Sequence, residues 1–168
     1  TQRRRQRQMC IRDSLGAAVR RQSASEVAAV LAEGVDVNEV IKSASSAPMN
    51  DGVRDYLRQT NAVEGFTALL VASTSGDPEI VRLLLAAGAN VHFAAMGCGA
   101  VYMASLSGHV QVVTMLLDAN AQVNTSSIAN GETPLWAACG KGYAEVVTKL
   151  IAANADVNEP DRKGCTPL

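Results

Sequence analysis

The sequence predicts an all-α protein, a solenoid of stacked helix pairs that are joined by β-turn or hairpin-like connections. Internal repetition is the first observation behind this prediction. Three segments align without gaps across their helices, and their glycines Gly76, Gly108 and Gly142 lie 32 and 34 residues apart. Composition is the second: 48% of the residues are apolar but only 4% are aromatic, which favours closely packed aliphatic helices over a sheet sandwich. A chain of 168 residues is expected to form one domain.

Capping residues and apolar spacing predict the helices of each unit. Thr133–Pro134 places a hydroxyl at an N-cap and a proline at the first helical position, and Asp77–Pro78 repeats this arrangement before a second helix. Apolar residues at spacings of one, four and five give each second helix one broad face that must be buried. These residues are Ile80, Val81, Leu84, Leu85, Val112, Val113, Leu116, Leu117, Val146, Val147, Leu150 and Ile151. Because Gly and Asn readily adopt the left-handed conformation that closes a helix, the second helices should end at Gly88, Asn120 and Asn154.

One repeat carries a specific family pattern. Gly131–Val147 reads GETPLWAACGKGYAEVV and Ala155–Asn158 reads ADVN, which together resemble the ankyrin-repeat pattern G-x-T-P-L-H-x-A-A…G-x-x-E-V-V…A-D-V-N. The resemblance covers most of residues 15–168. It implies an ankyrin-repeat solenoid that binds another protein and catalyses nothing itself.

Two departures from the family pattern stand out. The second unit has Gly99–Val101 where Thr-Pro-Leu is expected, so the helix that starts at Ala100 should be less well capped. The usual histidine position is occupied by Leu70, Tyr102 and Trp136.

The repeats divide the chain into segments. Residues 15–38 are expected to form a degenerate N-terminal ankyrin repeat, residues 39–63 an insertion, and residues 64–168 about three repeats and the start of another. Within the insertion, Val53–Arg58 either forms a short amphipathic helix or continues a loop. Gly164–Leu168 opens a further unit and stops, so the helix with Val146 and Ile151 is expected to lose part of its cover and to fray.

The arginine-rich start has two interpretations. As protein it would be a basic arm for nucleic acid or a nuclear localisation signal. Back-translated, however, Arg4–Asp13 resembles one frame of a transposon-based sequencing adapter, so residues 1–14 are interpreted as an artificial, disordered segment outside the fold. The remaining residues carry a net charge of about −5 and no basic run, which excludes nucleic acid from the expected partners.

Residues with chemical potential are few. The two histidines, His92 and His109, lie at turns, where stabilising the backbone is the favoured role. They and the cysteines lack zinc-ligand spacing, and no base is visible near a cysteine, so the sequence predicts no metal, no cofactor, no small-molecule substrate and no enzyme activity. The cysteines also lack the pattern of a secreted disulfide framework, and no apolar stretch has the length of a membrane helix. An intracellular, cytoplasmic protein without a membrane partner is expected.

The partner-binding residues are predicted from the resemblance, which places them at variable turn positions and on the exposed side of the first helices. They are Glu64, Phe66, Thr74, Ser75, Met96, Cys98, Tyr102, Leu106, Ser107, Asn130, Glu132, Trp136, Lys141, Arg162 and Lys163. Aromatic and methionine side chains are the expected apolar anchors. For Tyr102 and Trp136 the alternative is that they fill space between repeats.

Two functional hypotheses follow. The first is a protein-interaction scaffold whose specificity lies in these variable positions. The second is a targeting or regulatory ankyrin arm of a larger enzyme or channel. The sequence does not separate them.

Overall fold

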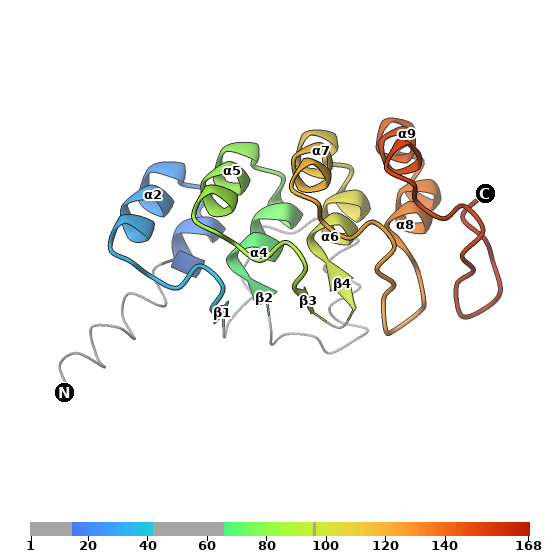
Figure 1. The fold of residues 1–168 in the computed structure, drawn as a ribbon, viewed down its shortest axis with the longest axis horizontal. Helices are drawn as coiled ribbons and strands as arrows, with labels where there is room; N and C mark the ends of the chain where they lie inside the picture. Colours follow the sequence, from blue (N-terminus) through green and yellow to red (C-terminus); the bar gives the residue numbers. More distant parts are fainter. Residues whose placement is uncertain (1–14, 42–65, 96) are drawn as a thin grey trace.

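Two rows of helices run side by side along the molecule in a computed structural model of the chain (Figure 1). The first row contains the helical residues 15–20, α4 (Ala68–Ser75), α6 (Ala100–Ser107) and α8 (Pro134–Lys141). The second row contains α2 (Ala24–Ala32), α5 (Pro78–Ala86), α7 (Val110–Asp118) and α9 (Ala144–Ala152). Helix α6 packs between α4 and α8, and α5 and α7 each pack between two neighbours of the second row. This arrangement confirms the stack of helix pairs.

Short antiparallel strand pairs occur in two of the connections. Strand β1 (Val40–Ile41) pairs with β2 (Phe66–Thr67), with Val40 opposite Thr67. Strand β3 (Ala94–Ala95) pairs with β4 (Cys98–Gly99), with Ala94 opposite Gly99. The expected hairpin-like connections are therefore confirmed.

The structure describes residues 15–41, 66–95 and 97–168. The expectations for residues 1–14 and for a helix at residues 53–58 lie outside this range, as do the contact residues Glu64 and Met96. No helix in the described ranges is long and apolar enough to span a bilayer.

The helix starts follow the capping chemistry in the sequence. The Thr133 hydroxyl accepts a hydrogen bond from the Trp136 N–H at 3.2 Å, and Pro134 is the first residue of α8. The Asp77 carboxylate accepts from the N–H groups of residues 79 and 80 at the start of α5. Helix α6 starts after Gly99 with no side-chain cap, which confirms the predicted weakness of this start.

The second helices end as predicted. Gly88, Asn120 and Asn154 have φ of 82°, 60° and 63°, the left-handed conformation that Gly and Asn adopt most easily. At the end of each first helix, Gly76, Gly108 and Gly142 take the same conformation.

The core lies between the two helix rows. Ile80, Val81 and Leu84 of α5 are at most 1% exposed, and their equivalents in α7 are fully buried. The fourth predicted position is less covered: Leu85 and Leu117 are only half-buried, and Ile151 on α9 is 43% exposed. The buried face is thus narrower than predicted, because the fourth residue of each helix lies at the rim of the contact with the first row.

The side chain of His109 packs on Gly76, the glycine that ends the first helix α4. His109 Nε2–H donates a hydrogen bond to the Thr74 carbonyl oxygen at 3.0 Å, and Thr74 lies in the last turn of α4. This contact supplies a partner to a carbonyl that the helix itself leaves unsatisfied. A Cβ atom on Gly76 would lie 2.3 Å from the His109 ring, so only glycine fits beneath it. The expected turn-stabilising role of His109 is confirmed.

Asparagine side chains form a second link between units. The Asn38 side chain accepts from the Asn90 N–H at 2.6 Å and donates to the Gly88 carbonyl oxygen at 3.2 Å. The Asn124 side chain accepts from the Asp156 N–H at 3.0 Å and reaches the Asn154 carbonyl oxygen at 3.5 Å. His92 occupies the equivalent position between these two, so this junction lacks the asparagine link.

Candidate functional site

Three of the segments at the turn edge of the stack, at the bottom of Figure 1, follow the second helices α5, α7 and α9. Each runs from the end of a second helix to the start of the next first helix or, in the last unit, to residues 166–168. We call them finger 89–99, finger 121–133 and finger 155–167.

Finger 121–133 is held by its own hydrogen bonds. The Ser127 N–H donates to the Glu132 carbonyl oxygen at 2.9 Å, and the Gly131 N–H donates back to the Ser127 carbonyl oxygen at 2.8 Å. The Asn130 side chain accepts from the Glu132 N–H at 3.2 Å. The Tyr102 hydroxyl donates to Glu132 Oε2 at 3.1 Å and ties the finger to α6. The tip is therefore fixed in shape.

Finger 155–167 is fixed in a similar way and joins its neighbour. The Asp161 carboxylate accepts from the N–H groups of Lys163 at 2.9 Å and Cys165 at 2.8 Å. The Arg162 N–H donates to the Asn130 carbonyl oxygen at 2.9 Å, so the two finger tips lie in contact. The Trp136 indole N–H donates to the Cys165 carbonyl oxygen at 3.2 Å. These bonds connect Trp136, both fingers and α8 in one surface.

Five of the predicted contact residues are buried instead of exposed. A side chain that is fully buried offers a partner no surface, so the expectation that these residues are accessible is wrong for this structure. Helix α6 contacts α4, α7 and α8, and α4 contacts α5 and α6, which covers most sides of these short helices. The Thr74 hydroxyl is also used internally, because it donates to the Leu70 carbonyl oxygen at 2.9 Å. The buried residues are Phe66, Thr74, Cys98, Tyr102 and Leu106.

For Tyr102 and Trp136 the structure distinguishes the two sequence interpretations. Tyr102 is fully buried and fills space between repeats, with its hydroxyl bonded to Glu132. Trp136, at the equivalent position of the third unit, remains half-exposed. Its ring lies against Gly140, where an added Cβ atom would be 3.3 Å from Trp136 Cζ3.

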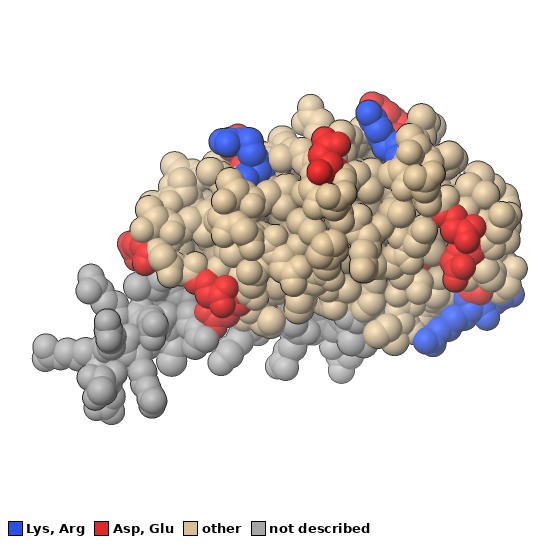
Figure 2. Space-filling view, in the orientation of Figure 1, with Lys and Arg blue, Asp and Glu red and all other residues tan. Residues whose placement is uncertain are grey.

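The accessible members of the predicted set gather toward the C-terminal half. Ser75 and Ser107 are half-buried at the ends of α4 and α6. The others lie on α8 and the last two fingers: Asn130, Glu132 and Trp136 are half-buried, and Lys141, Arg162 and Lys163 are exposed. Figure 2 shows Lys and Arg side chains at the end of the molecule that carries the last finger.

Ile128 was missed by the sequence analysis. It lies at the tip of finger 121–133 and is 56% exposed, a large exposure for an isoleucine. Six residues separate Asn124 from Gly131, against four between His92 and Gly97 in the preceding finger. The longer spacing is the sequence signal that could have identified a longer finger with an apolar tip.

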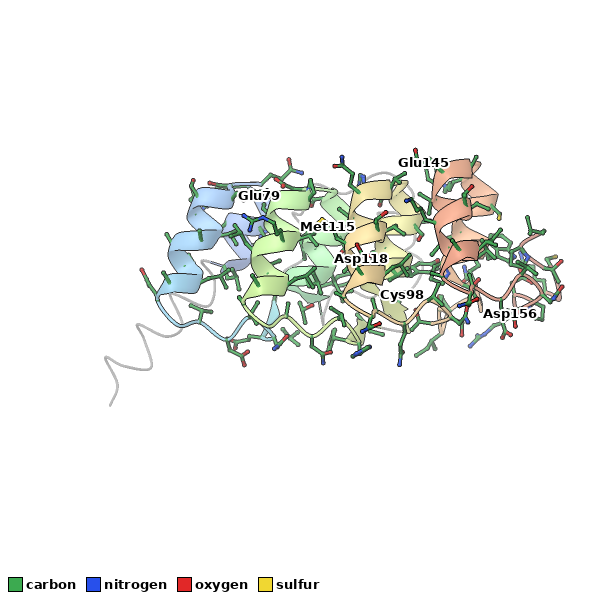
Figure 3. The ribbon with its side chains drawn as sticks, turned by 45° about the horizontal axis from the view of Figure 1, so that its top comes forward. Glu79, Cys98, Met115, Asp118, Glu145 and Asp156 are labelled. Carbon is green, nitrogen blue, oxygen red and sulfur yellow. The ribbon has the colours of Figure 1, made fainter. Side chains whose placement is uncertain are left out.

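A shallow groove of about 420 Å³ lies on the opposite side, between the second helices. It is lined by Pro78, Val110, Gln111, Thr114, Met115, Glu145 and Lys149. Figure 3 shows Met115 on α7 and Glu145 on the neighbouring α9, both on the second row and away from the finger edge. No predicted contact residue lines this groove.

The pKa is shifted for Cys139 and Glu79 among the described residues. Partial burial raises the pKa of the Cys139 thiol, which favours the protonated and less nucleophilic form. On α5, the hydrogen bond from Arg82 lowers the pKa of the Glu79 carboxyl, and this exposed pair lies on the second row. Among the described residues, no group of three or more His, Cys, Asp or Glu side chains is placed to hold a metal ion.

The helix rows and fingers define a helical repeat protein, in which similar helix–turn–helix units are stacked and joined by turns. A profile described as "Ankyrin repeats (3 copies)" matches residues 15–127 and 101–168. The chain therefore belongs to the ankyrin-repeat family, whose members generally mediate protein–protein interaction. No curated protein matches the chain.

Proposed function

We propose that the chain is a non-catalytic interaction module that binds a partner protein through its finger tips and the accessible residues of α8. The observation that carries this proposal is the connected surface of Asn130, Trp136 and Arg162, which hydrogen bonds hold in a fixed shape. A preformed surface loses little conformational freedom on binding, so more of the contact energy is available for affinity.

The composition of this surface favours a protein partner over other kinds of ligand. It combines a half-exposed indole, an amide and isolated charges, a composition typical of protein interfaces. On the face shown in Figure 2 the Lys and Arg side chains are few and are separated by acidic and uncharged residues, unlike the continuous basic patch that nucleic acids require. The proposal therefore has no nucleic acid, membrane, cofactor or small-molecule substrate as the ligand. It retains an intracellular location.

The module can act alone or as a targeting or regulatory arm of a larger enzyme or channel. The contact surface that we propose is the same in both cases, because it belongs to the repeats themselves. No observation on the described residues favours the second role.

Selection from displayed fragments of the source organism's own proteome tests this function. The full chain is the bait, and selected fragments are measured again with Trp136→Ala and with Lys149→Glu. Trp136→Ala should weaken binding, since it removes the aromatic centre of the proposed surface, whereas Lys149→Glu changes the groove on the second row and should have no effect. The opposite result is a fragment that binds the Trp136→Ala variant as tightly as the unaltered chain and fails to bind the Lys149→Glu variant. That result would show that the binding face lies on the second row of helices, and it would contradict the proposal.

A further inference from the structure

Asn130 is the one asparagine of the chain that is followed by glycine. An asparagine loses ammonia when the backbone nitrogen of the next residue attacks its side-chain carbonyl carbon, which makes this residue type thermolabile. Glycine hinders the attack least, because it has no Cβ atom. Asn130 and Gly131 lie in finger 121–133, just before the Thr133 N-cap of α8. They are the pair at which the sequence predicts this reaction.

The reaction uses water alone as its co-reactant. The Gly131 nitrogen forms a bond to Asn130 Cγ, the Cγ–Nδ2 bond breaks, and the Gly131 proton leaves with the amide nitrogen as ammonia. Water then opens the five-membered imide ring at one of its two carbonyl carbons, which gives aspartate or isoaspartate. Either product has a negative charge where the amide had none, since a carboxyl group is ionised at neutral pH.

Hydrogen bonds of the folded finger oppose this reaction. The Gly131 N–H donates to the Ser127 carbonyl oxygen at 2.8 Å, and the Asn130 side chain accepts from the Glu132 N–H at 3.2 Å. Closing the imide ring removes the Gly131 proton and turns the Asn130 side chain toward the Gly131 nitrogen, so it breaks both bonds. The finger must therefore open locally before Asn130 can react.

Two side chains outside this pair keep the finger closed. Ser127 is only 2% exposed, and its hydroxyl accepts from the Ala129 N–H at 3.2 Å. The Tyr102 hydroxyl donates to Glu132 Oε2 at 3.1 Å and ties the finger to α6. Loss of either hydroxyl favours the open finger, because only the closed form contains these hydrogen bonds.

We propose that Asn130 is a deamidation site that the native finger 121–133 keeps closed, so that it is modified only from the open finger. The modification also changes the neighbouring finger. The Asn130 carbonyl oxygen accepts from the Arg162 N–H at 2.9 Å, and isoaspartate adds one methylene group to the main chain at this point. The contact between the two finger tips is then lost. The product is thus a permanent mark on a chain whose finger has opened, whatever partner the finger edge binds.

Mass spectrometry of chymotryptic peptides measures this modification in the full chain at mildly alkaline pH, folded in buffer and unfolded in urea. Deamidation of Asn130 should be at least about tenfold slower in the folded chain, because only the open fraction reacts. Equal rates would show that the folded finger gives no protection, and a chain that stays unmodified in urea would show that Asn130 is not a site. Either result would overturn the inference.

Two pairs of variants test whether opening of the finger controls the reaction. Ser127→Ala and Tyr102→Phe each remove one hydroxyl that keeps the finger closed and should raise the folded-state rate by about fivefold. Ser126→Ala, at an exposed neighbour, and Tyr143→Phe, in the last unit, make the same changes elsewhere and should alter the rate by less than about twofold. Each folded-state rate is divided by the rate of the same variant in urea, which removes the effect of local sequence. Equal ratios for all four variants would refute the requirement for an open finger.

Anion exchange separates the modified chains, which carry the added negative charge. Hydrogen–deuterium exchange of the Arg162 amide should be faster in the isoaspartate fraction than in the unmodified one, while exchange in α5 should stay the same. An Arg162 amide that is equally protected in both fractions would show that the finger tips stay in contact, and it would refute the predicted effect on the neighbouring finger.

Discussion

Alanine substitution of the three equivalent glycines should destabilise the protein in the order Gly76 > Gly108 > Gly142. All three close a first helix in the left-handed conformation, with φ of 80°, 76° and 75°. The backbone cost of alanine is therefore nearly the same at each position, about 1 kcal/mol. What differs is the space that the new methyl group meets.

The size of each effect follows from these surroundings. At Gly142 no atom lies within 4 Å of an added Cβ, so Gly142→Ala should cost only the backbone term, about 1 kcal/mol. At Gly108 the Tyr143 ring lies 2.9 Å away and must shift, which raises the total to about 2 kcal/mol. At Gly76 the His109 ring lies only 2.3 Å away. Its displacement also breaks the bond to the Thr74 carbonyl oxygen, for a total of about 3 kcal/mol or more.

Urea unfolding followed by circular dichroism measures the three free energies. With an m value of about 2 kcal/mol per molar urea, the difference of about 2 kcal/mol between Gly76→Ala and Gly142→Ala moves the midpoint by about 1 M. His109→Ala in the Gly76→Ala background should then cost little, because the contact is already lost. Equal costs at the three glycines would refute the view that inter-unit ring contacts dictate glycine at these positions.

Three further predictions concern the unit junctions and the thiols. His92→Asn should raise the free energy of unfolding by about 1 kcal/mol in the same urea assay. The new side chain can form hydrogen bonds to the next unit like those that Asn124 forms to Asp156 and Asn154. An unchanged midpoint would argue that such hydrogen bonds do not stabilise the junction. Gly99→Thr should stabilise α6 by about 1 kcal/mol, because the threonine hydroxyl supplies the N-cap that the helix lacks. The site has room for the side chain, since the nearest atom, Thr125 Oγ1, lies 3.5 Å from the added Cβ. Unchanged amide protection in α6 would contradict this prediction. Alkylation of the native protein should modify the three described thiols in the order of their exposure, first Cys165, then Cys139 and last Cys98. Peptide mass spectrometry measures this order, and faster modification of Cys98 than of Cys165 would contradict the burial.

The repeating unit could be predicted from the sequence because local chemistry determines it. A hydroxyl or carboxylate followed by proline fixes a helix start, and Gly or Asn fixes a helix end, whatever surrounds them. The helix starts and ends therefore lie where the sequence predicted, with N-caps at Thr133 and Asp77 and a left-handed residue at Asn120. The missing cap at Gly99 was predicted for the same reason.

The exposure of the predicted contact side chains could not be predicted from the sequence in the same way. The first helices are eight residues long and contact neighbours on several sides, so residues 68–74 of α4 are all buried although two of them are polar. Thr74 and Leu106 occupy positions that are variable in pattern, but their burial depends on how closely adjacent units approach. Ile128 shows the opposite difference, because it is exposed although an isoleucine is normally assigned to the core. Only the length of its finger indicates that it projects outward.

The most direct test of the central claim is hydrogen–deuterium exchange of the full chain with and without a fragment selected from the proteome library. The account predicts slower exchange in residues 126–132 and 160–165, which form the tips of the last two fingers, and in the first turn of α8. Exchange in α5, α7 and α9 should be unchanged. Protection confined to α7 and α9, around the groove that contains Met115, would show that the partner binds the second row and would contradict the account.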